Sequence, residues 1–110
     1  MNPDHMEIAK RWFKHHSGSL LLPDGWFGRP YDNQHTLSTM QMKDDLFEVL
    51  LDDGKGVLSF YGLGSIWVEG KDLVFGRFNR AEFRYLATEG IRGGIVRTYL
   101  SGEVRFVCGP

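Results

Sequence analysis

The 110-residue sequence lacks several features from which protein function is often recognised. It has a single cysteine, Cys108, so no internal disulfide can form and the fold must rely on packing. No apolar run approaches the ~20 residues that a membrane-spanning helix needs, and residues 1–16 are too polar for the core of a secretory signal. We therefore expect a soluble, cytoplasmic protein without a membrane partner.

An excess of charge of either sign is also missing. The 13 Lys and Arg residues and 14 Asp and Glu residues give a formal net charge of −1. Proteins dedicated to nucleic acids usually carry a marked basic excess, because they must neutralise phosphates. The charge therefore argues against nucleic acid as the partner.

Recognisable metal and cofactor motifs are absent as well. One cysteine excludes the usual structural zinc sets, and there is no HExxH sequence. The segment Asp52-Asp53-Gly54 lacks the alternating ligands of a calcium loop and is typical of a hairpin turn. Gly62-Leu63-Gly64 and Arg92-Gly93-Gly94 each open onto an expected strand, whereas a phosphate-binding loop leads into a helix. The sequence predicts no metal, no cofactor and no catalytic set.

What the sequence does contain favours a β-rich fold. Aromatic residues make up 14% of the chain, and there are 14 glycines. Aromatic side chains suit a pleated, half-buried surface, and glycines suit frequent tight turns. The length is that of one domain with one core, so we expect residues 1–110 to form a single domain.

One helix is expected, over about residues 3–16. Asp4 and Glu7 have the spacing of a capping box at its start. Apolar residues then recur at helical spacing from Ile8 to Phe13, and Gly18 is a suitable end.

The remainder, residues 19–108, is expected to be β-rich, because short apolar runs alternate with Gly, Asp and Asn. The expected strands are Leu20–Leu22, His35–Met42, Leu46–Leu51, Val57–Tyr61, Ser65–Glu69, Leu73–Phe75, Ala81–Ala87, Ile95–Leu100 and Glu103–Cys108. Residues 79–90 also fit a helix with a capping box, but the alternation in Phe83-Arg84-Tyr85 favours a strand.

The short connections favour antiparallel pairing, because parallel strands need long crossovers. Several expected strands, such as Leu46–Leu51, carry apolar residues on both faces and need cover on each side. The predicted fold is mainly β (α+β): a curved antiparallel meander, or a partly closed barrel, packed against the N-terminal helix.

The longest connection, between Leu22 and His35, is the predicted binding loop. Pro23-Asp24-Gly25 has the pattern of a defined turn, so the loop is expected to be ordered. It mixes polar and aromatic side chains, which suits a polar ligand held against rings. The candidate ligand-binding residues are Trp26, Arg29, Tyr31, Asp32, Asn33 and His35. Alternatively, the loop closes one end of the sheet, with Trp26, Phe27 and Tyr31 filling the core.

The function is not identifiable from these patterns, and several hypotheses remain open. The leading one is a non-enzymatic domain that binds a small polar ligand or a protein through the Trp26–His35 loop. A second is a small hydrolase or lyase in which His35 works with Asp32 or Asp24 and Arg29 steers an anionic substrate. A third is binding of single-stranded nucleic acid on a sheet face of alternating arginines and aromatics. An exposed sheet edge could also pair two copies into a homodimer.

Overall fold

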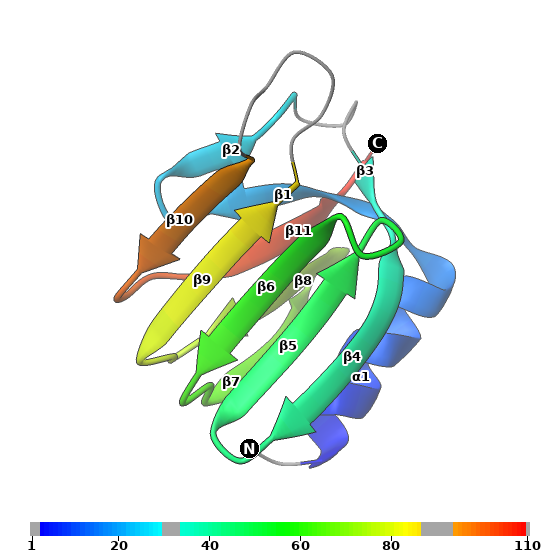
Figure 1. Cartoon of the computed structure of the whole chain (residues 1–110). Coiled ribbons are helices and arrows are strands. Elements are labelled where there is room, and N and C mark those ends of the chain that lie inside the picture. Colours follow the sequence, from blue (N-terminus) through cyan, green and yellow to red (C-terminus); the bar gives the residue numbers. More distant parts are fainter. Residues whose placement is uncertain (1–2, 30–33, 87–93, 110) are drawn as a thin grey trace.

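The structure, a computed structural model, describes residues 3–29, 34–86 and 94–109. Its strands form two antiparallel sheets that lie face to face and do not close into a barrel, with one helix beside them (Figure 1). The prediction of a mainly β fold with one N-terminal helix is confirmed. Among the described residues, no helix is long and apolar enough to cross a membrane.

The first sheet contains strands from both ends of the chain. Its order is β2-β1-β11-β8-β7, and β3 also pairs with β1. Its strands are β1 (Gly18–Leu22), β2 (Gly25–Phe27), β3 (Gln34–His35), β7 (Ser65–Glu69), β8 (Asp72–Gly76) and β11 (Val104–Cys108).

The second sheet contains the middle of the chain, in the order β10-β9-β6-β5-β4. Its strands are β4 (Leu37–Lys43), β5 (Leu46–Leu51), β6 (Gly56–Tyr61), β9 (Arg80–Tyr85) and β10 (Ile95–Tyr99). The register places Glu82 opposite Ser59 and Thr98, so these three side chains share the outer face. Phe83 faces the other way, toward the first sheet.

The hydrophobic core lies between the two sheets, because each sheet turns one set of alternating side chains inward. Phe60 of the second sheet stacks on Phe75 of the first, with ring centroids 4.9 Å apart. Phe75 in turn meets Phe106 edge-on at 6.0 Å. These rings, like Leu20 and Phe83, are fully buried. The sequence alternation therefore corresponds to the two faces of each sheet.

The helix α1 (Pro3–His15) packs against β7 and β4, one edge strand from each sheet. The indole Nε1 of Trp12 donates a hydrogen bond to the carbonyl oxygen of Lys71, in the β7–β8 turn, at 2.9 Å. Gly18 allows a close approach: a Cβ atom there would lie 2.9 Å from the Trp12 ring. The helix thus lies against one edge strand of each sheet.

Two predictions about individual segments need correction. The run His35–Met42 is not one strand, because the chain leaves the first sheet after β3 and enters the second at β4. The expected loop after Leu22 contains a strand, β2, which forms a hairpin with β1. Within the antiparallel architecture, the chain passes repeatedly from one sheet to the other.

The ambiguous segment over residues 79–90 is a strand where it is described. β9 pairs with β6 and β10 from Arg80 to Tyr85, so the strand interpretation is confirmed there. Residues 87–90 lie outside the described residues.

Candidate functional site

A polar network joins the two sheets at one end of the core. It begins with His35, which pairs with Gly18 of β1 and is only 3% exposed. Its Nδ1 lies 2.7 Å from Oδ2 of Asp52, at the end of β5. A carboxylate can only accept, so Nδ1 carries the proton and donates it. The His35–Asp52 contact therefore links a strand of the first sheet to a turn of the second.

The turn after β5 aims the Asp52 carboxylate inward. Asp52, Asp53 and Gly54 have φ values of 54°, 58° and 88°, a left-handed stretch that Asp tolerates better than most residues. The turn is anchored to the neighbouring chain, since the Asp52 N–H donates to the Thr36 carbonyl at 2.9 Å. The Gly54 N–H donates to the Ser38 hydroxyl at 3.1 Å. These bonds fix where the carboxylate points.

Asp52 also accepts hydrogen bonds from two other groups. The Thr36 N–H donates to Oδ1 at 3.0 Å, and the Tyr85 hydroxyl donates to Oδ2 at 3.0 Å. Burial raises the pKa of Asp52. The hydrogen bonds from His35 and Thr36, the charge of His35 and the Tyr85 bond outweigh that effect, so the pKa lies below its ordinary value of 3.8. Asp52 is therefore ionised at neutral pH.

The pKa of Tyr85 is shifted in the opposite direction to that of Asp52. Burial, together with its hydrogen bond and proximity to the Asp52 carboxylate, raises the pKa of the phenol to about 12. Its ring needs Gly56 on the paired strand, because a Cβ atom there would lie 3.0 Å from the ring. Tyr85 thus remains a neutral donor whose ring lies close to Gly56 of β6.

Aromatic rings surround this network. The ring of Phe27, from β2, lies 5.8 Å from His35, 5.1 Å from Tyr85 and 4.8 Å from Phe83, measured between centroids. The second ring nitrogen of His35, Nε2, is buried and has no hydrogen-bond partner within the described ranges. Groups of three or more metal-ligating side chains are also absent from those ranges.

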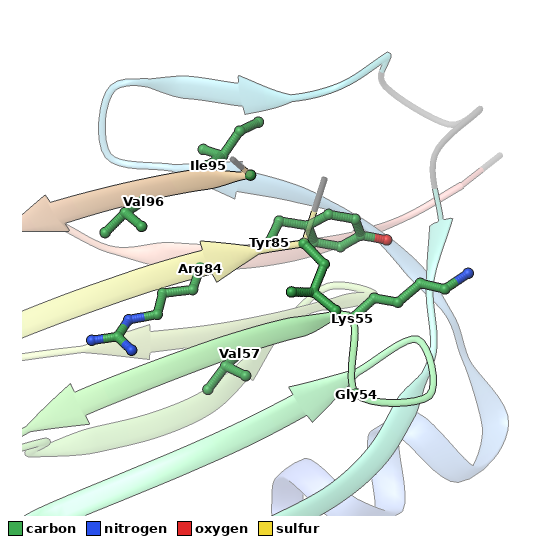
Figure 2. A pocket seen from close by; sticks show the side chains of 9 residues that line it. Gly54, Lys55, Val57, Arg84, Tyr85, Ile95 and Val96 are labelled. Carbon is green, nitrogen blue, oxygen red and sulfur yellow. The ribbon is translucent and has the colours of Figure 1, made fainter. Parts of the chain in front are cut away.

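A hollow of about 490 Å³ lies beside this network, where β6 begins, β9 ends and β10 begins. Tyr85 belongs to both features, because it lines the hollow and bonds to Asp52. The other side chains around the hollow are Lys55, Val57, Arg84, Leu86, Ile95 and Val96. Figure 2 shows Val57 and Val96 on the strands at the hollow, with the Arg84 and Lys55 side chains extending in opposite directions.

The structure distributes the predicted binding residues over different environments. Trp26 and Arg29 are exposed, whereas His35 is buried. Tyr31, Asp32 and Asn33 lie outside the described residues. None of the described loop side chains is among those that line the hollow. Ligand binding by the loop stays a prediction.

The alternative interpretation, in which the loop fills the core, agrees with the structure for part of the loop. Phe27 packs on Phe83 in the interior, while Trp26 remains on the surface. Asp24, a predicted partner of His35, instead accepts a hydrogen bond from the Tyr99 hydroxyl at 2.8 Å. The observed partner of His35 is Asp52.

Sequence reasoning missed Asp52 and Tyr85 as members of a site. The segment Asp52–Gly54 is a turn, as predicted, but nothing in its spacing indicates that one carboxylate faces inward. The polar residue at the end of an apolar run, immediately before a turn, is the only available signal. Comparisons with protein-family models, curated proteins and solved structures find no match for this chain.

Proposed function

We propose that this chain is a non-enzymatic binding domain whose hollow beside Tyr85 takes a small organic molecule with an apolar body and an anionic group. The observation that carries this proposal is the lining: apolar side chains and two cations, with no carboxylate among the described lining residues. Such a combination is typical of small-molecule sites, in which an apolar surface supplies affinity and a few polar groups fix the orientation.

The apolar part of the lining is open to solvent. Leu86 and Val96 are 65% and 64% exposed, so a ligand that covered them would remove apolar surface from water. The N–H of Leu86 donates to the carbonyl of Lys55 at 2.9 Å, which continues the β6–β9 pairing past the end of β9. The backbone beneath Leu86 is thereby fixed before any ligand arrives.

The two cations differ in their availability. The Nε of Arg84 is paired with Glu82, while the guanidinium remains largely exposed. Lys55 has no ion pair within the described part of the chain, and its side chain is exposed. An anionic group on the ligand would therefore find Lys55 without a competing carboxylate. A flexible lysine can reach such a group at little strain.

The polar network supports the hollow from the interior. Tyr85 cannot move without breaking its bond to Asp52, which is itself held by His35 and Thr36. This arrangement makes one wall rigid, which lowers the entropy cost of binding.

Two matched probes test the proposal: naphthalene-2-carboxylate and the neutral naphthalene-2-methanol. Titration of the ¹⁵N-labelled protein should shift the amide resonances of residues 54–57, 84–86 and 94–96 with both probes. The carboxylate should bind more tightly by a few-fold, since an exposed ion pair contributes roughly 0.2–1 kcal/mol. The Lys55→Gln substitution should remove the tighter binding of the carboxylate. The control is Lys71→Gln, which replaces an exposed lysine in the β7–β8 turn and should leave that difference in affinity unchanged.

A steric variant provides a second test. Val57→Trp should fill the hollow and weaken both probes by at least ten-fold. Leu50→Trp is its control, because Leu50 pairs with Val57 and faces the same side but does not line the hollow. Equal binding to the two tryptophan variants, or shifts confined to other regions, would refute the proposal.

The other hypotheses have less support. Acid–base catalysis at His35 would require a substrate to reach a ring that is 3% exposed. The aromatics interleaved with arginines over residues 75–85 offer little stacking surface for a nucleic acid, because Phe75, Phe78 and Phe83 are buried and Tyr85 is partly buried. The cytoplasmic location stays a prediction. A homodimer also stays a proposal, for which β10 offers a surface.

A further inference from the structure

We infer that this chain forms a homodimer in which β10 pairs antiparallel with β10 of a second copy and continues the second sheet across a two-fold axis. Within the described residues, β10 pairs with β9 only, so its outer edge presents unpaired backbone groups. An edge of this kind is a template for another strand. The pairing needs no ligand in the hollow, although Val96 lines the hollow and also lies on β10.

The other sheet edges are covered, irregular or short, whereas β10 carries one protective feature, the inward-pointing Arg97, which lies near Asp24. The helix α1 lies against β7 and β4, and β4 also has an irregular register between Leu37 and Thr39. The strand β2 has only three residues. In contrast, β10 pairs with β9 over five consecutive residues without a register shift, and it contains no proline. Bulges, covering elements and short strands are the usual protection of an edge.

Exposed apolar side chains gather at this same edge. The three most exposed large hydrophobic residues of the described chain are Leu86, Val96 and Leu100, at 65%, 64% and 74%. Val96 lies on β10, Leu100 follows it, and Leu86 follows the neighbouring β9. A second copy paired along β10 would cover Val96 and Leu100, which a monomer leaves in water, whereas Leu86 lies one strand away from the edge.

The inward side chains of β10 are already occupied. The Tyr99 hydroxyl donates to Asp24 at 2.8 Å, and an Arg97 nitrogen lies 4.0 Å from the same carboxylate. These contacts tie β10 to the β1–β2 turn. Val96 and Thr98 are exposed and share the outer face with Arg84 and Glu82 of β9. The strand β10 lies at the edge of its sheet (Figure 1), so it is held in place while its edge and outer face remain available.

Charge and polarity select one register for the pairing. A two-fold axis at Arg97 would place two guanidinium groups directly opposite each other, which destabilises a strand pair. An axis at Thr98 places Thr98 opposite Thr98 of the second copy. It also places Val96 opposite Leu100 and Arg97 opposite Tyr99. This register joins apolar with apolar side chains and a cation with an aromatic ring.

Disulfide trapping tests this register, in a Cys108→Ser background that removes the native thiol. Directly opposed residues of an antiparallel pair have Cα atoms about 4.5–5.5 Å apart, within the range a disulfide bridges. Thr98→Cys should therefore give a covalent dimer under mild oxidation. Val96→Cys is the matched control, because the two positions 96 would be offset by four residues, about 13 Å along the strands.

Multi-angle light scattering over a concentration series accompanies the trapping. The unmodified chain should show a dimer mass at high concentration. The Val96→Lys substitution should raise the dissociation constant of the dimer by at least ten-fold. A monomer at every concentration would overturn the inference. So would a dimer in which Thr98→Cys is trapped no faster than Val96→Cys, because it would place the interface or register elsewhere. Circular dichroism confirms that each variant is folded.

Discussion

The carboxylate of Asp52 accepts hydrogen bonds from His35, Thr36 and Tyr85. The amide of an asparagine at this position would keep the shape of the carboxylate but lose its charge. Its NH₂ group is a hydrogen-bond donor and would face the donor groups that the carboxylate oxygens now accept from. We therefore expect Asp52→Asn to lower the free energy of unfolding by about 1–3 kcal/mol, the usual cost of an unsatisfied buried polar group. Urea denaturation measures the change.

Asp53→Asn is the matched control for that variant. Asp53 has nearly the same backbone conformation, with φ of 58° against 54°, but its side chain is exposed. Its substitution should change the unfolding free energy by less than about 0.5 kcal/mol, as at most surface positions. If the two variants lost equal stability, the turn conformation rather than the network would be responsible.

The lowered pKa of Asp52 gives the stability a pH dependence. An acid whose pKa is below 3.8 in the folded state stabilises the protein fully above its unfolded pKa, and this contribution is lost as the pH falls through the folded value. The difference in unfolding free energy between the original chain and Asp52→Asn should therefore shrink below pH 4. Denaturation at a series of pH values measures it, and a constant difference down to pH 2 would contradict the proposed ionisation.

The same carboxylate shows how far the sequence can predict a site. The sequence predicts Asp32 or Asp24 as the partner of His35, but Asp24 accepts a hydrogen bond from Tyr99 and Asp32 lies outside the described residues. Asp52 lies 17 positions away and reaches His35 only because two sheets pack face to face. The choice among three acids therefore depends on tertiary packing, which local spacing does not encode.

At the level of elements, α1 packs against an edge strand of each sheet, and Trp12 connects the helix to the rest of the molecule. The ring is 4% exposed, contacts Phe106 and donates to the Lys71 carbonyl. Trp12→Ala should lower the free energy of unfolding by about 3–5 kcal/mol, the range for large aromatic truncations. Arg11→Ala, on the exposed side of the same helix, should change it by less than about 0.5 kcal/mol. Thermal and urea denaturation together test the pair.

The elements themselves were largely predictable, because their periodicities are local. The helix ends at His15, one residue before the expected end, and β5 and β7 have the expected bounds. The change of sheet at Thr36 was not predictable. The run from His35 to Met42 reads as one strand, and only the bonds between Thr36 and Asp52 show why the chain turns there.

For the molecule as a whole, the inferred dimer predicts a stability that depends on protein concentration. Anything that binds the folded state alone raises the apparent stability by mass action. The Tm of the unmodified chain should rise by several degrees between micromolar and near-millimolar protein, whereas the Tm of Val96→Lys should not. Differential scanning calorimetry at several concentrations measures this, and a constant Tm in both proteins would contradict a dimer.

The alternation of the chain between the two sheets has a consequence for how the protein opens. The connections β3–β4, β6–β7, β8–β9 and β10–β11 each cross from one sheet to the other. Neither sheet is therefore formed by one continuous segment of chain that could stay folded alone. If one sheet unfolds, the other loses the side chains that cover its inner face and the segments to which its strands are covalently joined. Backbone amides at the centre of each layer should accordingly exchange with deuterium through the same global event and at the same free energy. The protein should unfold as one cooperative unit, because the chain crosses repeatedly between its two sheets.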